Sequence, residues 1–355
     1  MLGRGIDQIL PHPSDPRLWE PGMISAAGYV ALAEAANGPI PTRVDPAYVW
    51  GDVLDVLDRR RPDARIVNLE TAVTTRADPE PKGINYRMNP ANAGVLVAAG
   101  VDACALANNH VLDWGVEGLV ETLEVLERCG IRTAGAGRNL REASAPAVLP
   151  LSEKRRVLLH AFGCGSAGIP GSWAATAEGP GINRLPNLSL ATARRVAREI
   201  LPMRNPADVV VASIHWGGNW GYEVGGEEIA FAHALIDEAG VDVVHGHSSH
   251  HPRPIEIYRG KPVLYGCGDF LNDYEGIEGY ERFRGDLTLM YLVTFDAARG
   301  TLAGLEMIPF RIRKFRLGRA DRTDSAWLCD TLTREGRRFG TRVHLSAEHT
   351  LSLAW

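Results

Sequence analysis

Short apolar runs and helical repeats of apolar residues alternate along the middle of the chain. Apolar runs of roughly four to eight residues between turn residues predict buried strands, and apolar positions three and four residues apart predict amphipathic helices. The predicted strands cover 64–69, 101–107, 131–134, 146–150, 156–162, 208–214 and 241–244, and the predicted helices cover 46–60, 89–100, 114–130, 189–203 and 227–240. This alternation predicts an α/β fold with sheets in its centre.

The pattern becomes strand-rich after residue 250. The runs RPIEIYRG, KPVLYG and DLTLMYLVTFD predict successive strands, and 309–319 predicts one further strand with a basic outer face. No linker-like change of composition divides the chain. We therefore predict one α/β domain over 1–320, followed by a helical extension over 321–355 that packs on it.

The composition is that of a globular protein, with 45% of the 355 residues hydrophobic and 23% charged. The net charge is only -5, and Lys and Arg are scattered, which argues against nucleic acid as a partner. No apolar run reaches roughly 18 residues, as a membrane-spanning helix requires, and no signal peptide pattern opens the chain. We therefore expect a cytoplasmic protein without a membrane segment.

Polar side chains that can bind metal follow the predicted strands at their carboxyl ends. They are Glu70, Asn109, His110, His215, His247 and His250. Taken singly, Asn109 is equally typical of a turn, and His215 of a hydrogen-bonded core position. Because the carboxyl ends of strands in an open α/β sheet meet at one edge, the joint placement favours a metal site there. Carboxylate, amide and imidazole ligands together suit Mn, Fe or Zn.

Five ordered segments carry a family resemblance. They are VNLET (67–71), LANNHVLDWG (106–115), SIHWGGNWGYE (213–223), GHSSHHP (246–252) and PVLYGCGDFL (262–271). Together they resemble the motifs of the poly-γ-glutamate capsule-synthesis (CapA-type) family, which belongs to the calcineurin-like metallophosphoesterase superfamily. The resemblance implies a four-layer α/β/β/α sandwich with two divalent metal ions at the strand ends.

The resemblance also implies roles for individual residues. The implied metal ligands are Glu70, Asn109, His215, His247 and His250. His110 resembles the histidine that contacts the phosphate and protonates the leaving group, and Asp113 resembles the acid that orients this histidine. From its position before the helix at 114–130, Asp113 is also expected to act as the N-cap.

The sequence departs from the family pattern at its start. Relatives carry an apolar strand ending in Gly-Asp before a segment like MLGRGIDQIL, whereas this sequence begins at Met1 within that motif. The resemblance therefore implies that an N-terminal strand and its aspartate ligand are missing. Either the start lies upstream or the site has lost a ligand. We expect the first, because deletion of a central strand would leave two unpaired ladders in the core. A second departure is Asp269, where relatives often carry Asn.

Three functions remain open at this point. The leading one is a metal-dependent phosphoesterase with His110 as general acid, in which Lys82 and Arg87 hold an anionic group of the substrate. The ordinary alternative is that these two basic residues are solvent-exposed charges in a loop and bind no substrate. The other functions are a metal-dependent amide hydrolase acting on γ-glutamyl bonds, and a non-catalytic accessory protein of poly-γ-glutamate synthesis that binds an anionic polymer. The expected partner is a small or polymeric anion, and the sequence defines no oligomeric state.

Overall fold

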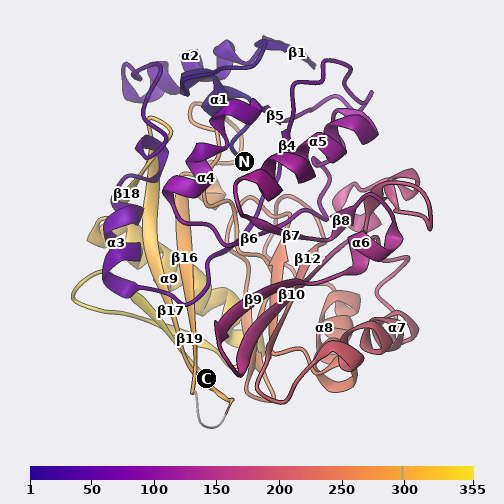
Figure 1. The fold of residues 1–355 in the computed structure, drawn as a ribbon. Coiled ribbons are helices and arrows are strands. Elements are labelled where there is room, and N and C mark those ends of the chain that lie inside the picture. The colour runs from indigo at the N-terminus through magenta and orange to yellow at the C-terminus, as the bar shows by residue number, and fades with distance from the viewer. Residues whose placement is uncertain (297–299) are drawn as a thin grey trace.

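The computed structural model describes residues 1–296 and 300–355, and its largest sheet lies in the middle of the chain (Figure 1). β12 pairs in parallel with β10 on one side and with β13 on the other, and β15 is parallel to β13. β9 and β14 close the two edges in antiparallel fashion. The order is β14 (Ile255–Tyr258), β15 (Lys261–Leu264), β13 (Val243–His247), β12 (Val209–His215), β10 (Arg155–Gly163) and β9 (Ala147–Ser152).

The two faces of this sheet bury different partners because side chains alternate along each strand. Leu158 and Phe162 of β10 join the apolar cluster of α7 (Leu190–Ile200) and α8 (Gly226–Ala239). Leu159 and Ala161 of the same strand join the cluster that contains β6. The sheet is therefore covered by α7 and α8 on one face and by the first half of the chain on the other.

A three-stranded parallel sheet forms the core of the first half. Its order is β3 (Ile66–Asn68), β6 (Ala103–Ala105) and β7 (Arg132–Ala134). All residues of β6 are fully buried. The amphipathic helix α5 (Gly115–Arg128) follows β6 and ends before Gly130, whose φ of 73° ends the helix as the sequence predicts.

The five-stranded sheet brings the last part of the chain together. Its order is β16 (Leu287–Phe295), β17 (Leu302–Arg313), β20 (Leu351–Ala354) and β19 (Arg342–Leu345), with β18 (Arg316–Arg319) also paired to β17. The prediction of one strand over 309–319 is wrong, because Lys314 and Phe315, with φ values of 59° and 53°, form a two-residue turn between β17 and β18.

The helical extension predicted for 321–355 is helical only in its first part. α9 (Arg322–Gly336) is present, but β19 and β20 follow it, and β20 continues the sheet through β17. Their alternating apolar residues, Val343 and Leu345 in one strand and Leu351 and Leu353 in the other, face the cluster under α9. This part of the chain therefore contributes strands to a sheet as well as packing on it.

β3 and β16 each end a sheet. Within the described residues no strand pairs with the outer edge of either one, although Ile66 and Met290 contribute to the same core cluster. The first residues form α1 (Gly5–Ile9), and the amino group of Met1 donates to the carbonyl oxygen of Leu271 at 2.7 Å. A strand ending in Gly-Asp is thus not part of the described fold. The α/β class is confirmed, and the four-layer sandwich stays a prediction.

The remaining elements are short and mostly connect the sheets. The helices are α2 (Ala27–Asn37), α3 (Asp52–Arg60), α4 (Gly94–Ala98) and α6 (Leu140–Ser144), and the strands are β1 (Arg17–Glu20), β2 (Met23–Ser25), β4 (Ala72–Val73), β5 (Arg87–Met88), β8 (Ala136–Gly137) and β11 (Gly181–Ile182). The 3-10 turns are η1 (Tyr48–Trp50), η2 (Pro90–Asn92), η3 (Gly165–Ala167), η4 (Gly171–Trp173), η5 (Leu201–Met203), η6 (Glu281–Phe283) and η7 (Arg337–Phe339). Throughout the described part of the chain, every helix is too short or too polar to cross a bilayer.

Candidate metal centre

Two histidines lie side by side where two parallel strands end. His215 closes β12, His247 closes β13, and the two residues are register partners. Their Nδ1 atoms are 2.8 Å apart, and both side chains are buried. Burial lowers the pKa of His215 to about 4, and burial together with the neighbouring histidines holds the pKa of His247 well below its usual range. Both imidazoles are therefore neutral near pH 7, which is the form that binds metal.

An amide and a carboxylate oxygen approach the other nitrogen of His215. Asn109 Oδ1 lies 3.1 Å from His215 Nε2, and Glu70 Oε1 lies 3.9 Å from it. Two ligands that are each about 2.1 Å from one ion are separated by about 3 to 3.5 Å. The spacing of Asn109 Oδ1 and His215 Nε2 therefore fits shared coordination of one divalent ion, whereas Glu70 Oε1, at 3.9 Å, would have to move closer to His215 to join them.

Asn108 fixes the ends of β3 and β6 beside this group. Its Nδ2 donates to Asn68 Oδ1 at 3.0 Å and to the Leu69 carbonyl at 2.9 Å, and its Oδ1 accepts the His110 amide at 3.1 Å. Within the described residues, no three His, Cys, Asp or Glu side chains are grouped so that they could hold a metal ion. The donors around His215 Nε2 include an amide, so they form a mixed set rather than such a group.

His250 contacts a carboxylate rather than the other imidazoles. Its Nδ1 lies 3.1 Å from both carboxylate oxygens of Asp269, and its Nε2 lies 3.4 Å from the hydroxyl of Tyr274. Burial disfavours the charged form of His250, but the charge and hydrogen bond of Asp269 outweigh this and raise its pKa. The Asp that departs from the family pattern is therefore the residue that orients His250.

His110 and Asp113 form a second pair at the same strand ends. His110 Nδ1 lies 2.6 Å from Asp113 Oδ2, and the Lys82 ammonium donates to Asp113 Oδ1 at 2.7 Å. The amide of Tyr86 donates to Asp113 Oδ2 at 2.6 Å, and the Tyr86 ring packs edge-on against His110. The carboxylate of Asp113 is fully buried and has a donor on each oxygen.

The structure contradicts the N-cap role predicted for Asp113. α5 begins at Gly115 after Trp114, and no side chain caps it. The reason is that the three donors from Lys82, His110 and Tyr86 already use the Asp113 carboxylate. Asp113 is thus a residue of the site and not of the helix end.

The two predicted substrate-binding cations are placed differently. Lys82 lies beside the His110–Asp113 pair and also donates to the carbonyl oxygen of Asn109. Arg87 makes other contacts: its guanidinium donates to the carbonyl oxygens of Arg76 and Asp15 and stacks 4.0 Å from the Trp114 ring. The structure therefore brings Lys82 to the site and does not bring Arg87 there.

One supporting residue, Ser213, is missing from the sequence prediction. Its Oγ lies 2.9 Å from His247 Nε2 and 2.9 Å from His245 Nδ1. Ser213 is two positions before His215 in β12, so both side chains are on one face of the strand. That alternation is the signal that identifies it.

The fold and these contacts define an α/β protein with imidazole, amide and carboxylate groups gathered at strand ends. The family model described as "Bacterial capsule synthesis protein PGA_cap" matches residues 1–274. The chain belongs to this family of bacterial capsule synthesis proteins.

Individual relatives extend the comparison. The chain is 48% identical to the "Probable polyglutamine synthesis accessory protein" of Mycobacterium tuberculosis, over 99% of this chain and 93% of that protein. It is 26% identical to the "Capsule biosynthesis protein CapA" of Bacillus anthracis, over 66% of this chain and 53% of that protein. It is 29% identical to the "PGA biosynthesis protein CapA" of Bacillus subtilis, over 59% of this chain and 52% of that protein.

Proposed function

We propose that this protein is a metal-dependent hydrolase that cleaves phosphate esters. The observation that carries the proposal is the approach of Asn109 Oδ1 and Glu70 Oε1 to His215 Nε2, with the His110–Asp113 pair beside them. The residues proposed to hold two divalent ions, of Mn, Fe or Zn, are Glu70, Asn109, His215, His247 and His250. Lewis-acid activation of the phosphoryl group is the chemistry that such ions supply when bound.

His110 is the proposed proton donor. Its Nδ1 is held by Asp113, so Nε2 is the nitrogen left to deliver a proton to the leaving-group oxygen. Asp113 fixes the direction of the ring, because three donors hold its carboxylate in place. An imidazole oriented in this way is the arrangement that general acid catalysis requires.

Lys82 is the proposed contact for the anionic substrate. A quarter of its side chain is exposed, while the Asp113 carboxylate that it binds is completely buried. It also lies 5.2 Å from the Trp173 ring, which confines the ammonium group to this side of the site. A partly exposed ammonium next to the proton donor favours binding of a phosphate group at this position.

The test has two measurements. Metal content is measured by plasma mass spectrometry on purified protein, and phosphate release is measured from a panel of phosphate monoesters and diesters. We expect the purified protein to contain bound transition metal and to hydrolyse at least one ester of the panel. His110→Ala should abolish this hydrolysis and leave the metal content unchanged. Protein that binds no Mn, Fe or Zn and hydrolyses no ester of the panel would contradict the proposal.

The name of one relative favours a second function. The Mycobacterium tuberculosis protein, which matches almost the whole chain, is called an accessory protein of polyglutamine synthesis. An accessory role would use Lys82 at the same site to bind an anionic polymer, with or without cleavage of its γ-glutamyl amide bonds. Equilibrium binding of poly-γ-glutamate that needs Lys82 but not His110 would favour this function, and release of glutamate from the polymer would favour an amide hydrolase.

A further inference from the structure

We propose that a second anion-binding site lies between α3 and the end of β18, separate from the residues around His215. A cavity of about 380 Å³ opens there. Val56 and Ile308, which are both buried, line it together with Glu348, Thr350 and the three arginines Arg59, Arg60 and Arg319. This volume is within the range of roughly 300 to 1,000 Å³ that is typical of small-molecule sites.

The three arginines come from different parts of the chain. Arg59 and Arg60 end α3, whereas Arg319 ends β18, more than two hundred positions later. Arg60 pairs with Glu306 at 3.1 Å, with both side chains about 40% exposed. Arg59 has no carboxylate within 4 Å in residues 1–296 and 300–355. Three guanidinium groups and one carboxylate, that of Glu348, thus line the cavity, so positive charge exceeds negative charge there in a protein whose net charge is negative.

Arg319 is held in place before any ligand binds. Its Nη2 donates to the carbonyl oxygen of Glu348 at 3.0 Å, and its backbone amide donates to Asp52 Oδ2 at 2.8 Å. The hydroxyl of Tyr48 donates to the Lys314 carbonyl at 3.0 Å and so fixes the turn before β18. A preorganised guanidinium loses less entropy on binding an anion than a mobile one.

The crowding of these positive charges affects the pKa of Arg319. Burial lowers the pKa of Arg319, and the charges of Arg59 and Arg60 lower it further, although Asp52 opposes them. The dipole of α3 stabilises Arg59 and Arg60 at its C-terminus, but it gives no reason for the Arg319 side chain in the same cavity, because the Arg319 backbone lies against Asp52 at the N-terminus of the helix. A bound anion would relieve the repulsion among the three guanidinium groups.

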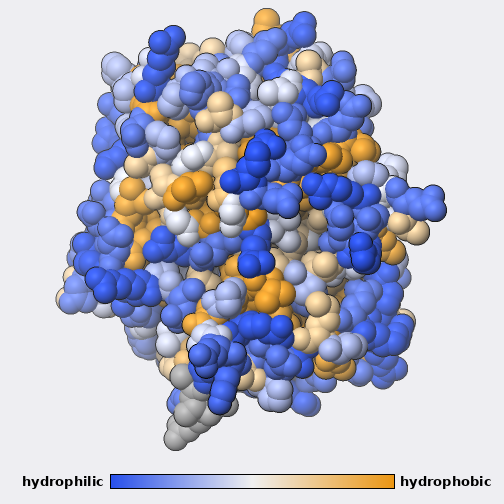
Figure 2. All heavy atoms as spheres, in the orientation of Figure 1, coloured by the Kyte–Doolittle hydropathy of each residue, from blue (hydrophilic) through white to orange (hydrophobic). Residues whose placement is uncertain are grey.

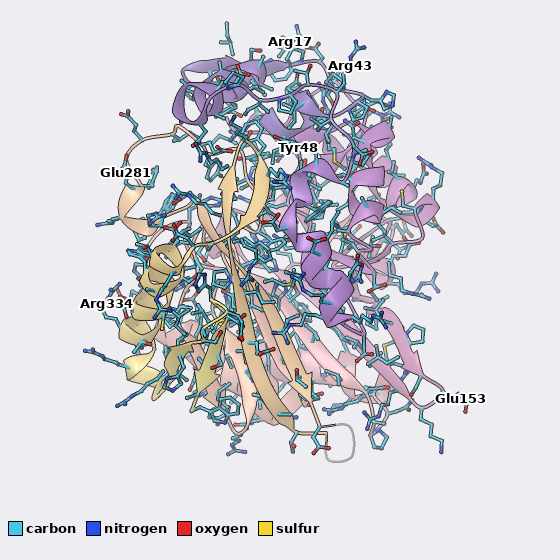
Figure 3. The ribbon with its side chains drawn as sticks, turned by 90° about the vertical axis from the view of Figure 1, so that its left-hand side faces the viewer. Arg17, Arg43, Tyr48, Glu153, Glu281 and Arg334 are labelled. Atoms are coloured by element: carbon cyan, nitrogen blue, oxygen red, sulfur yellow. The ribbon has the colours of Figure 1, made fainter. Side chains whose placement is uncertain are left out.

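The cavity and the candidate metal centre share no lining residue, and parts of the two flank β3 in the sequence. Arg59 and Arg60 precede this strand, whereas Glu70 follows it. Figure 1 shows α3 beside β17 and β18 at one side of the molecule, and Figure 3 turns this side, with Tyr48 labelled, toward the viewer. In Figure 2 hydrophilic side chains gather around the lower end of α3. The proposal therefore does not depend on the proposed hydrolase function.

The chemistry of the walls defines the ligand class. Guanidinium groups bind carboxylate and phosphate groups through paired hydrogen bonds. The floor of Val56 and Ile308 suits a short apolar segment next to the anionic group. We infer that the ligand is a small organic anion that carries phosphate or carboxylate groups.

The test is isothermal titration calorimetry on EDTA-treated full-length protein, with inorganic phosphate and glutarate as separate probes. The variants are Arg59→Gln and Arg319→Gln, with Arg141→Gln on α6, an exposed arginine elsewhere on the surface, as the matched control. His247→Ala reports on the candidate metal centre. Arg59→Gln keeps the test valid if Arg319→Gln reduces stability, because the Arg59 side chain makes no hydrogen bond or ion pair within the described residues. Thermal unfolding of each variant is recorded.

We expect one site for at least one probe, and we expect each cavity variant to weaken it by about tenfold or more, since a charged hydrogen bond contributes roughly 1.5 to 3 kcal/mol. Arg141→Gln and His247→Ala should leave the affinity unchanged. Preference for phosphate or for glutarate then identifies the source of the anionic group. Absence of binding for both probes, binding that survives Arg59→Gln, or binding that disappears with His247→Ala would each overturn the proposal.

Discussion

His215 and His247 lie opposite each other on neighbouring parallel strands, with their Nδ1 atoms 2.8 Å apart. Two neutral rings at this distance must use different tautomers, because only one nitrogen can donate the proton between them. On the far side of the His247 ring, the Ser213 hydroxyl lies 2.9 Å from Nε2 and either donates a hydrogen bond to it or accepts one from it. This contact links the tautomers of the two rings. Parallel pairing thus brings the two imidazoles into contact through Nδ1, while His215 Nε2 stays directed at Asn109 Oδ1 and Glu70 Oε1.

Replacement of His247 by alanine should therefore remove bound metal. His215 would lose its register partner, and one of the proposed ligands would be absent. Metal content per chain, measured by plasma mass spectrometry, should fall by at least half. The matched control is His233→Ala on α8, because His233 pairs with Glu256 at 3.0 Å and lies in another part of the fold. Equal metal content in both variants would exclude His247 as a ligand.

Asp113→Asn tests the orientation of the proposed proton donor. An amide in place of the carboxylate keeps the shape but removes the charge that binds Lys82 and His110. By analogy with acids that orient a catalytic histidine, we expect kcat for a phosphate ester to fall by roughly 10² to 10⁴ while metal content is retained. Asp102→Asn, at an exposed position next to β6, is the control. A variant with unchanged kcat would show that Asp113 has only a structural role.

The strand ends were the predictable part of the site. Apolar runs identify β3, β6, β12 and β13, and the rule that sites lie at their carboxyl ends brings Glu70, Asn109 and His215 together. The direction of Arg87 was not predictable, because it depends on the register of a two-residue strand. The local pattern alone predicted that Asp113 caps the following helix. Its carboxylate instead accepts hydrogen bonds from donors in the segment 82–86, which is distant in the sequence.

The C-terminal part shows a similar limit. Its alternation is too short to distinguish a strand from an exposed extension, and β20 is stabilised by β17, about 45 residues earlier along the chain. The turn at Lys314 and Phe315 carries none of the Asn or Gly residues that usually mark a two-residue hairpin. Non-local strand pairing therefore determines β20, and an unusual turn determines the boundary between β17 and β18. Neither can be predicted from the local sequence.

Arg4 should be essential for stability, because its charge is almost completely buried between two acids. Its guanidinium lies 2.7 Å from Asp273 and 3.0 Å from Glu20, and it stacks 3.6 Å from the Tyr29 ring. Arg4→Met leaves two buried carboxylates without their partner, which typically costs about 3 to 5 kcal/mol. Urea unfolding should show this loss. Arg43→Met is the matched control, since Arg43 is exposed and also has a positive φ, 53° compared with 57° for Arg4.

The stability of the folded protein should decrease in acid, in part because of His160 in β10, which lies away from the candidate metal centre. Burial lowers its pKa from 6.5 to about 4, and its Nε2 has no hydrogen-bond partner among the described residues. The unfolded chain therefore binds this proton at a higher pH than the folded chain does. The contribution to stability is complete above pH 6.5 and is lost as the pH falls toward 4, with about 2 kcal/mol already lost at pH 5.

His160→Leu should remove this dependence. Relative to the parent protein, the variant should gain about 2 kcal/mol between pH 7 and pH 5 in the free energy of unfolding measured with urea. The leucine also avoids burying an unpartnered ring nitrogen, so the gain should not be offset by a lost hydrogen bond. His344→Leu, at an exposed position of β19, is the control and should follow the parent at both pH values. Parallel curves for His160→Leu and the parent would mean that His160 is protonated, or reached by water, in the folded protein.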